Sequence, residues 1–175
     1  AQVQGGHGGP FGAVIVKDGR IIAEGANEVT SSNDPTAHAE IVAIRRACEA
    51  LGTFSLVGAT IYASCEPCPM CLAAIYWARL DRLVFANTRS EAAGIGFDDA
   101  LIYDEIPKPI GARTLPTLHL PLAEAAAAFA AGMVSSAASM ADSISSSLAR
   151  AAPCSGGAMT SVISPFTEGR AARMA

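Results

Sequence analysis

A histidine, two cysteines and a carboxylate stand in a spacing suited to metal chemistry. The stretch His38-Ala39-Glu40 is followed, further along the chain, by Pro67-Cys68-Pro69-Met70-Cys71. One neutral imidazole and two thiolates supply three ligands to a tetrahedral zinc ion and leave the fourth position open for water. Three protein ligands are typical of a catalytic zinc site, whereas structural sites use four. Glu40 is therefore not needed as a ligand and is available to transfer protons.

The cysteine count also bears on this interpretation. The chain has five cysteines: Cys48, Cys65, Cys68, Cys71 and Cys154. Three of them fall within residues 65–71, which is poorly suited to disulfides. An iron–sulfur site or a chance group of buried thiols would be the alternatives for the cluster alone, but the His-x-Glu stretch favours zinc. Cys65 is expected to pack, because a fourth thiolate would close the site. Reduced thiols predict a reducing compartment, the cytoplasm.

The bulk composition limits the kind of partner. With 175 residues the chain suits one ordinary domain with a sizeable core, followed here by an unusual tail. The net charge of -4 provides no electrostatic footprint for a nucleic acid and favours a small neutral substrate. The apolar runs are too short to span a bilayer, and no secretory leader is evident at the start. We therefore expect neither a nucleic-acid nor a membrane partner.

The elements that must position the ligands can be read from capping signals. A helix is predicted over residues 36–51, with Asp34-Pro35 at its start and Gly52 at its end. His38 and Glu40 are two positions apart, so along a helix their side chains would point to nearly opposite sides. Both can reach one metal only if the metal lies off the N-terminal end of the helix.

A second helix is predicted from Glu66-Pro67 to about residue 78. Cys68 and Cys71 would then share the first turn, where the helix dipole favours their thiolates. Strands parallel to each other should flank this helix, because a strand–helix–strand unit is a right-handed crossover. The predicted strands and the last predicted helix cover residues 11–16, 21–25, 60–64, 82–86 and 117–120, and then 122–131.

Three further residues carry weaker signals. Asn27 follows a strand in a polar stretch, where an asparagine most often bonds the local backbone. Asp98 and Asp99 are adjacent carboxylates, which are usually solvated surface groups.

The last part of the chain has a different composition. Residues 132–175 are rich in Ser and Ala, and they form either a disordered or weakly helical tail or the product of a shifted reading frame. The predicted deaminase domain therefore ends at residue 131.

Taken together, these motifs resemble the bacterial guanine deaminases of the cytidine deaminase superfamily. The similarity runs from about Gly8 to Phe129. The His-x-Glu and Pro-Cys-x-x-Cys motifs are specific for the superfamily as a whole, and the Phe-Asp-Asp segment indicates the guanine branch. The stretches that carry the resemblance are residues 9–12 (GPFG), 34–40 (DPTAHAE), 64–71 (SCEPCPMC) and 96–99 (GFDD).

The resemblance implies a three-layer α/β/α fold around a mixed five-stranded sheet, and hydrolysis of guanine to xanthine and ammonia. It implies that His38, Cys68 and Cys71 hold Zn²⁺ and that Glu40 shuttles the proton. The remaining implied contacts are with the purine: hydrogen bonds from Asn27 and Asp99, the Ala39 backbone N–H at the carbonyl, and Phe11 against the ring. A homodimer formed by exchange of C-terminal segments, with an aromatic residue that caps the partner's pocket, is also implied.

The chain departs from the family at both ends. The first helix of the family is missing ahead of Gly5, and residues 132–175 replace a short tail that ends in an aromatic residue. The capping residue, the exchanged dimer and the level of activity stay open for this reason. A tRNA adenosine deaminase, another nucleobase or nucleoside deaminase, and an inactive zinc-binding module are the alternative functions. Guanine, another purine and a nucleoside all stay open as the substrate.

Overall fold

The computed structural model describes residues 8–130 and residue 145. The described residues divide into two units, a first unit of residues 8–107 and a second unit that begins at residue 108. The first unit holds the sheet and every residue discussed above as a site candidate. The predicted boundary at residue 131 and the tail that follows it lie, apart from Ser145, outside the described residues.

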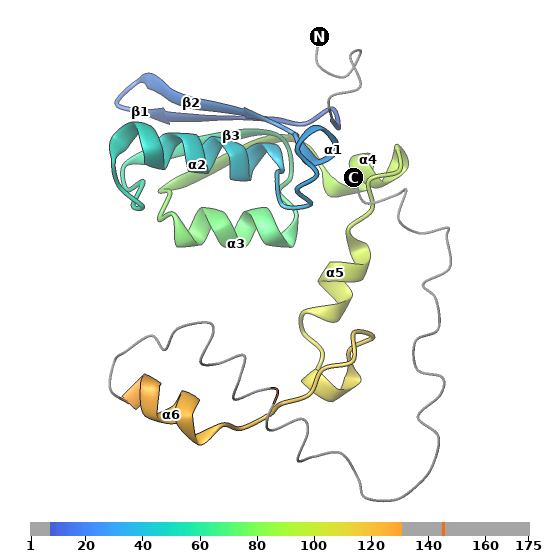
Figure 1. Cartoon of the computed structure of the whole chain (residues 1–175). Helices are drawn as coiled ribbons and strands as arrows, with labels where there is room; N and C mark the ends of the chain where they lie inside the picture. Colours follow the sequence, from blue (N-terminus) through green and yellow to red (C-terminus); the bar gives the residue numbers. More distant parts are fainter. Residues whose placement is uncertain (1–7, 131–144, 146–175) are drawn as a thin grey trace, which may run out of the picture. The chain divides into compact units, whose positions relative to one another are not determined.

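The sheet is mixed and has the order β2-β1-β3-β4 (Figure 1). β1 (Gly12–Lys17) and β2 (Arg20–Ala26) form a hairpin, and β3 (Ala59–Cys65) pairs antiparallel with β1. β4 (Arg82–Asn87) runs parallel to β3, as a crossover through the intervening helix requires. Asp18 and Gly19 make the hairpin turn with positive φ angles of 50° and 71°, which match the twist of the two strands. The first four predicted strands are confirmed.

The fifth predicted strand is wrong. Residues 117–120 have no strand structure, so the described residues contain a four-stranded sheet rather than a five-stranded one. Pro116 and Pro121 bracket this run and supply no N–H group for a ladder. Leu118 is also 75% exposed, and no residue from 108 to 130 is buried, so these residues offer the run no buried face. A short β-rich run becomes a strand only where it finds a partner edge.

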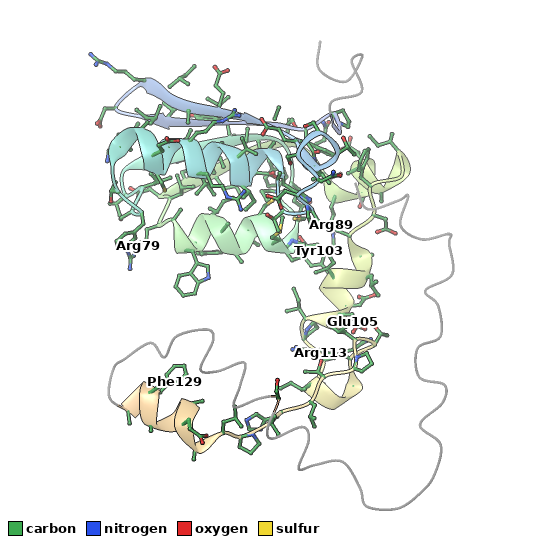
Figure 2. All side chains as sticks on the ribbon, viewed as in Figure 1. Arg79, Arg89, Tyr103, Glu105, Arg113 and Phe129 are labelled. Atoms are coloured by element: carbon green, nitrogen blue, oxygen red, sulfur yellow. The ribbon has the colours of Figure 1, made fainter. Side chains whose placement is uncertain are left out.

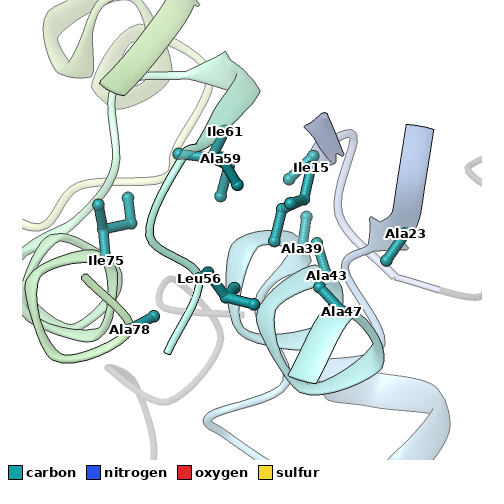
Figure 3. Close-up of a cluster of buried hydrophobic side chains, with 11 residues drawn as sticks. Ile15, Ala23, Ala39, Ala43, Ala47, Leu56, Ala59, Ile61, Ile75 and Ala78 are labelled. Atoms are coloured by element: carbon teal, nitrogen blue, oxygen red, sulfur yellow. The ribbon is translucent and has the colours of Figure 1, made fainter. Parts of the chain in front are cut away.

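Small residues bring helix α2 (Ala39–Leu51) close to the sheet. Ala39, Ala43 and Ala47 are fully buried at helical spacing and face the core with Ile15 and Leu56 (Figure 3). On the sheet side, the position of Gly25 allows the same approach, since a Cβ atom there would lie 2.1 Å from the Ala39 carbonyl oxygen. The start of α2 is thus held against β2 by direct backbone packing.

Helix α3 (Pro69–Trp77) lies on the same face of the sheet as α2, with Ile75 buried in the shared core. The opposite face carries Tyr62 and Val84, which are 45% and 40% exposed. Within residues 8–107, helices therefore cover one face of the sheet, whereas the resemblance implied cover on both. The α/β class is confirmed, but the third layer is not present among these residues.

The remaining elements are short. In the first unit they are α1 (Val29–Ser32), α4 (Arg89–Gly94) and α5 (Ala100–Glu105). The second unit contains the 3₁₀ helix η2 (Ile110–Ala112) and α6 (Ala123–Ala130), and α6 confirms the last predicted helix within the described range. Among the described residues, no helix combines the length and the apolar character that crossing a membrane would require.

Candidate active site

Helix α2 begins three residues later than the sequence predicted. The carboxylate of Asp34 accepts hydrogen bonds from the backbone N–H and the hydroxyl of Thr36, at 2.8 and 2.7 Å, and so closes a turn instead of capping the helix. His38 is the N-cap residue, with an extended backbone (φ -67°, ψ 155°), and Glu40 lies in the first turn. Both side chains therefore belong to the N-terminal end of α2, which is the condition that the two-residue spacing demanded.

Helix α3 also begins later than predicted, at Pro69 rather than at Glu66-Pro67. Cys68 is its N-cap residue, again with an extended backbone (φ -62°, ψ 166°). Cys71 follows in the first turn and is fully buried. Two helix N-termini, each with its positive dipole end, thus meet at one point, where they favour negatively charged thiolates.

The three predicted ligands lie together. The His38 Nδ1 atom is 3.6 Å from the Cys68 Sγ atom and 3.5 Å from the Cys71 Sγ atom, and all three ligand atoms lie within 4.8 Å of one another. A tetrahedral zinc ion with ordinary Zn–N and Zn–S bond lengths holds a nitrogen and a sulfur ligand about 3.5 Å apart. The donor set and its spacing therefore fit zinc with three protein ligands.

Cys65 lies outside this group. Its thiol is buried and donates to the Thr88 carbonyl oxygen at 3.6 Å. The metal-binding group found among the described residues contains only His38, Cys68 and Cys71. This placement agrees with the expectation that Cys65 packs and leaves the fourth coordination position free.

The three clustered side chains shift one another's pKa values. Hydrogen bonding from the Cys71 thiol, with a further contribution from His38, lowers the pKa of Cys68 to about 4. The contact with Cys68, together with burial, raises the pKa of Cys71, and the contact with Cys68 also raises the pKa of His38. Because zinc binds thiolates and neutral imidazole, metal binding by this group is expected to depend on pH.

Glu40 lies beside the ligands without belonging to their group. Its side chain is buried, with 8% exposed, and its Oε2 atom accepts from the Cys71 thiol at 3.5 Å. Burial raises the pKa of Glu40 above its ordinary value. A buried carboxylate with a raised pKa is suited to accept and return a proton near neutral pH.

A pocket of about 340 Å³ opens above this group. Three predicted substrate contacts, Phe11, Asn27 and Asp99, line the pocket. Ala39 does not line it; the residue is fully buried at the first position of α2. The other lining residues are Pro35, His38, Glu40, Cys65, Glu66, Cys68, Met70, Arg89, Ala92, Phe97, Asp98 and Ile102.

The backbone orients the Asn27 side chain. Asn27 is 5% exposed, and its Oδ1 atom accepts from the backbone N–H groups of Gly9 and Val29, both at 3.3 Å. The local bonding that the sequence suggested is therefore real. These two bonds also fix the orientation of the amide. Its NH₂ group donates in none of the hydrogen bonds described for the first unit and is therefore the end available to a ligand in the pocket.

The two adjacent carboxylates have different surroundings. Asp98 is exposed and accepts from the Ala100 backbone N–H at 2.9 Å, which ties it to the start of α5. Asp99 is partly buried, and burial together with the negative charge of Cys68 raises its pKa, against the opposing effect of Arg89. Both carboxylates line the pocket, and Asp99 is the more buried of the two.

Sequence reasoning missed part of the pocket wall. Phe97 meets Phe11 edge to face, with ring centroids 4.9 Å apart. Arg89 and Ile102, from α4 and α5, also line the pocket. Helix α5 was not predicted, and no local signal marks Arg89. The only usable signal was Phe97, which stands beside the two carboxylates in the GFDD segment.

A mixed α/β sheet that presents a His/Cys/Cys group and a free carboxylate at two helix N-termini defines a metal-dependent hydrolase site. Residues 2–87 match the family model described as the cytidine and deoxycytidylate deaminase zinc-binding region. The guanine deaminase of Bacillus subtilis is 60% identical over 122 residues, which are 70% of this chain and 78% of that relative. The chain therefore belongs to the cytidine and deoxycytidylate deaminase zinc-binding family.

Two further comparisons describe the extent of the similarity. A crystal structure of guanine deaminase from Bacillus subtilis superposes with a TM-score of 0.73 at 57% identity, over 75% of this chain and 83% of that chain. A tRNA-specific adenosine deaminase of Agrobacterium fabrum is 57% identical over 76 residues, which are 43% of this chain and 50% of that enzyme. The similarity to guanine deaminase thus extends over more of both chains.

Proposed function

We propose that this protein is a zinc-dependent guanine deaminase, which converts guanine and water to xanthine and ammonia. The observation that carries the proposal is the position of Glu40, 3.5 Å from a ligand thiol in a pocket that Asn27 and Asp99 also line. The 60% identity to the Bacillus subtilis guanine deaminase supports the choice of substrate.

His38, Cys68 and Cys71 would hold the metal. Bound zinc supplies a water whose pKa is lowered to about 7. Glu40 takes a proton from the attacking water while the oxygen adds to C2 of guanine, the carbon that bears the amino group. The same carboxylate passes this proton to the adjacent ring nitrogen. It then takes the proton of the new C2 hydroxyl and delivers it to the amino group, which leaves as ammonia when the C2–N bond breaks and the C2 carbonyl forms. Glu40 can do this because it is not a ligand and keeps a free lone pair.

Asn27 and Asp99 would select the base. The free NH₂ group of Asn27 donates to an acceptor on the purine, and the Asp99 carboxylate accepts from the ring N1–H and the amino group of guanine. Adenine has no N1–H and would face Asp99 with a lone pair. A site with buried polar partners of this kind rejects a mismatched analogue by about 10⁴-fold.

Two smaller contacts complete the proposed substrate pose. The Ala39 backbone N–H, at the open end of α2, is a donor for the purine carbonyl. Phe11, braced by Phe97, offers a face for stacking. Ala39 is fully buried and does not line the pocket, so its contact would run through the backbone N–H alone.

Deamination of adenosine in tRNA is the second candidate, and the 57% identity to the Agrobacterium fabrum enzyme over 76 residues is the observation in its favour. Such a substrate needs a basic surface for its phosphates, whereas this chain carries 16 acidic and 12 basic residues. An inactive zinc-binding module is the non-enzymatic alternative. The retained Glu40 speaks against it.

The deciding experiment combines zinc content with ammonia release from guanine, adenine, cytosine and guanosine, and from a tRNA anticodon stem. We expect about one zinc ion per chain and release from guanine, followed by the ultraviolet change as xanthine forms. Release from the stem alone would favour the tRNA enzyme, and zinc without any release would favour the inactive module.

The role of Glu40 has its own test. Glu40→Gln should retain zinc and lower kcat by about 10²–10⁴-fold, because the amide cannot accept the proton. Glu49→Gln, an exposed position on the same helix, is the control and should turn over normally. Normal turnover in the Glu40 variant would contradict the assignment, whereas loss of zinc would make Glu40 a ligand.

Two wider features belong to the proposal. We expect a homodimer, as the family resemblance implies, and size-exclusion chromatography with light scattering would test this. We also expect a reducing compartment such as the cytoplasm, because the ligand thiols must stay reduced to bind zinc.

A further inference from the structure

The segment that carries Asp99 has little hydrophobic anchorage. Helices α4 and α5 are six residues each, and neither has a buried residue. Core packing, which fixes α2 and α3, therefore does not fix the position of Asp99. A carboxylate that must meet the N1–H edge of a rigid purine needs its position set to within about 0.5 Å. Polar and aromatic contacts must supply that restraint.

Two contacts of Tyr103 tie α5 to the zinc-ligand loop and to α4. The Tyr103 hydroxyl donates to the Pro67 carbonyl oxygen at 3.4 Å, one residue before the ligand Cys68. The Arg89 guanidinium carbon lies 4.3 Å from the centroid of the Tyr103 ring. Figure 2 shows both side chains beside the N-terminal end of α3. The ring and hydroxyl of one residue thus join three separate segments.

The other end of this connection is held by Glu66. The backbone N–H of Arg89 donates to the Glu66 Oε2 atom at 3.1 Å, and the backbone N–H of Glu66 donates to the Asn87 carbonyl oxygen at 2.8 Å. Within α5, the backbone N–H of Tyr103 donates to the Asp99 carbonyl oxygen at 3.4 Å. The contacts therefore connect the ligand loop to α4 and α5, and Asp99 is joined to them through the backbone of Tyr103.

We propose that Tyr103 is a positioning residue for substrate selection, which sets the position of Asp99 relative to the metal ligands through its contacts with Pro67 and Arg89. The inference rests on the proposed guanine deaminase function. Tyr103 does not line the pocket, so it acts through Asp99 and not on the substrate. Arg89 does line the pocket, so a substitution there could also remove a direct contact with the substrate. Substitution of Tyr103 therefore tests the positioning effect alone.

The test compares guanine with 2-aminopurine. Both carry the amino group at C2, but 2-aminopurine lacks the N1–H from which Asp99 would accept. It also lacks the C6 carbonyl, a difference that is the same for every variant compared. Tyr103→Phe removes only the bond to Pro67 and should lower the guanine to 2-aminopurine ratio of kcat/KM about threefold. Tyr103→Leu also removes the Arg89 contact and should lower it about tenfold, with zinc content unchanged. Tyr76→Leu, at a tyrosine that is 76% exposed on α3, is the matched control and should leave the ratio unchanged.

A double-mutant cycle shows whether the effect passes through Asp99. In an Asp99→Asn background, Tyr103→Leu should leave the guanine to 2-aminopurine ratio of kcat/KM unchanged. When Glu40→Gln is added to that background to block turnover, Tyr103→Leu should also leave the equilibrium binding of guanine unchanged. An equal loss for both substrates, or an additive loss in the Asp99→Asn background, would overturn the proposal. Absence of guanine turnover in the unmodified protein would instead refute the proposed function, so the two failures are distinguishable. The binding measurement remains informative if a variant is inactive.

Discussion

At the scale of single residues, side chains of the same type differ in what they can do because their hydrogen-bond partners and their burial differ. Asp98 and Asp99 both line the pocket, but Asp98 accepts a hydrogen bond from the Ala100 N–H, whereas Asp99 is partly buried and has a raised pKa. Cys65 is paired with a backbone carbonyl, while Cys68 and Cys71 meet His38. Residue type suggests a role, and the local partners decide whether the side chain is free to perform it.

Asn27 allows a nearly isosteric test of this point. Asn27→Asp keeps the oxygen that accepts from Gly9 and Val29 but replaces the NH₂ donor with a second acceptor. We expect the fold to persist and the KM for guanine to rise about 10–100-fold, because a buried acceptor would face an acceptor on the purine. Steady-state kinetics with zinc analysis checks this. Asn33→Asp, at an exposed left-handed position, is the control, and an unchanged KM in the Asn27 variant would remove Asn27 from the substrate site.

The pH dependence of binding offers a second test at this scale. Asp99 must be ionised to accept from guanine, so guanine binding should weaken as the pH falls through the pKa of Asp99. Arg89 lowers that pKa, and burial raises it. Removing the charge in Arg89→Met should therefore raise the pKa further and move the loss of binding to higher pH.

Guanine dissociation constants, measured against pH in a Glu40→Gln background, isolate this titration from proton transfer. Arg20→Met removes an exposed charge at the hairpin turn and should leave the profile in place. A profile that is identical with and without the Arg89 charge would show that Asp99 does not control binding.

At the scale of elements, the important fact is where each helix starts. His38 and Cys68 are N-cap residues with extended backbones, so α2 and α3 each present one ligand just outside the helix and a second functional group in the first turn. The approach of α2 to β2 then decides whether these groups meet. Gly25 makes that approach possible.

Gly25→Ala should disrupt the site from a distance. Its Cβ atom would lie 2.1 Å from the Ala39 carbonyl oxygen and 2.6 Å from the Ala43 nitrogen, both of which belong to the helix backbone and cannot rotate away. We expect a loss of about 1–3 kcal/mol in the free energy of unfolding, together with reduced zinc content, because α2 carries His38. Denaturant unfolding and metal analysis measure both. Gly94→Ala, where a Cβ atom meets nothing within 4 Å, should change neither, and full zinc retention in the Gly25 variant would show that α2 tolerates the shift.

At the scale of the whole molecule, the metal site joins parts that are distant in sequence. Residue 38 precedes β3 in the sequence and residue 68 follows it, so a bound ion would link α2 to α3. Zinc that binds only the folded chain stabilises it by about 4 kcal/mol when free zinc exceeds its dissociation constant about 1,000-fold. The fold and the activity should therefore depend on the same ion.

Removal of zinc with a chelator should abolish ammonia release and lower the melting temperature, and added Zn²⁺ should restore both. The Glu40→Gln variant should lose the same increment of melting temperature on chelation, because Glu40 is not expected to hold the metal. Differential scanning calorimetry with and without chelator makes the comparison. An unchanged melting temperature would mean that the His/Cys/Cys group does not hold a metal that contributes to stability.

The sequence alone determined the four strands that pair and the positions of α2 and α3 to within a few residues, and it predicted which histidine and cysteines would lie together and which carboxylate would lie beside them. It could do so because these features depend on local chemistry: ligand identity, period-two apolar runs, and Pro and Gly signals. It overextended both helices at their starts, since Asp34 could equally close a turn, and it predicted a strand at residues 117–120 whose existence depends on a partner edge. Only the tertiary structure showed that His38, Cys68 and Cys71 lie within 4.8 Å of one another, that burial raises the pKa of Asp99, and that Arg89 packs against the ring of Tyr103. Distances between segments remote in sequence arise from packing, which no local pattern encodes.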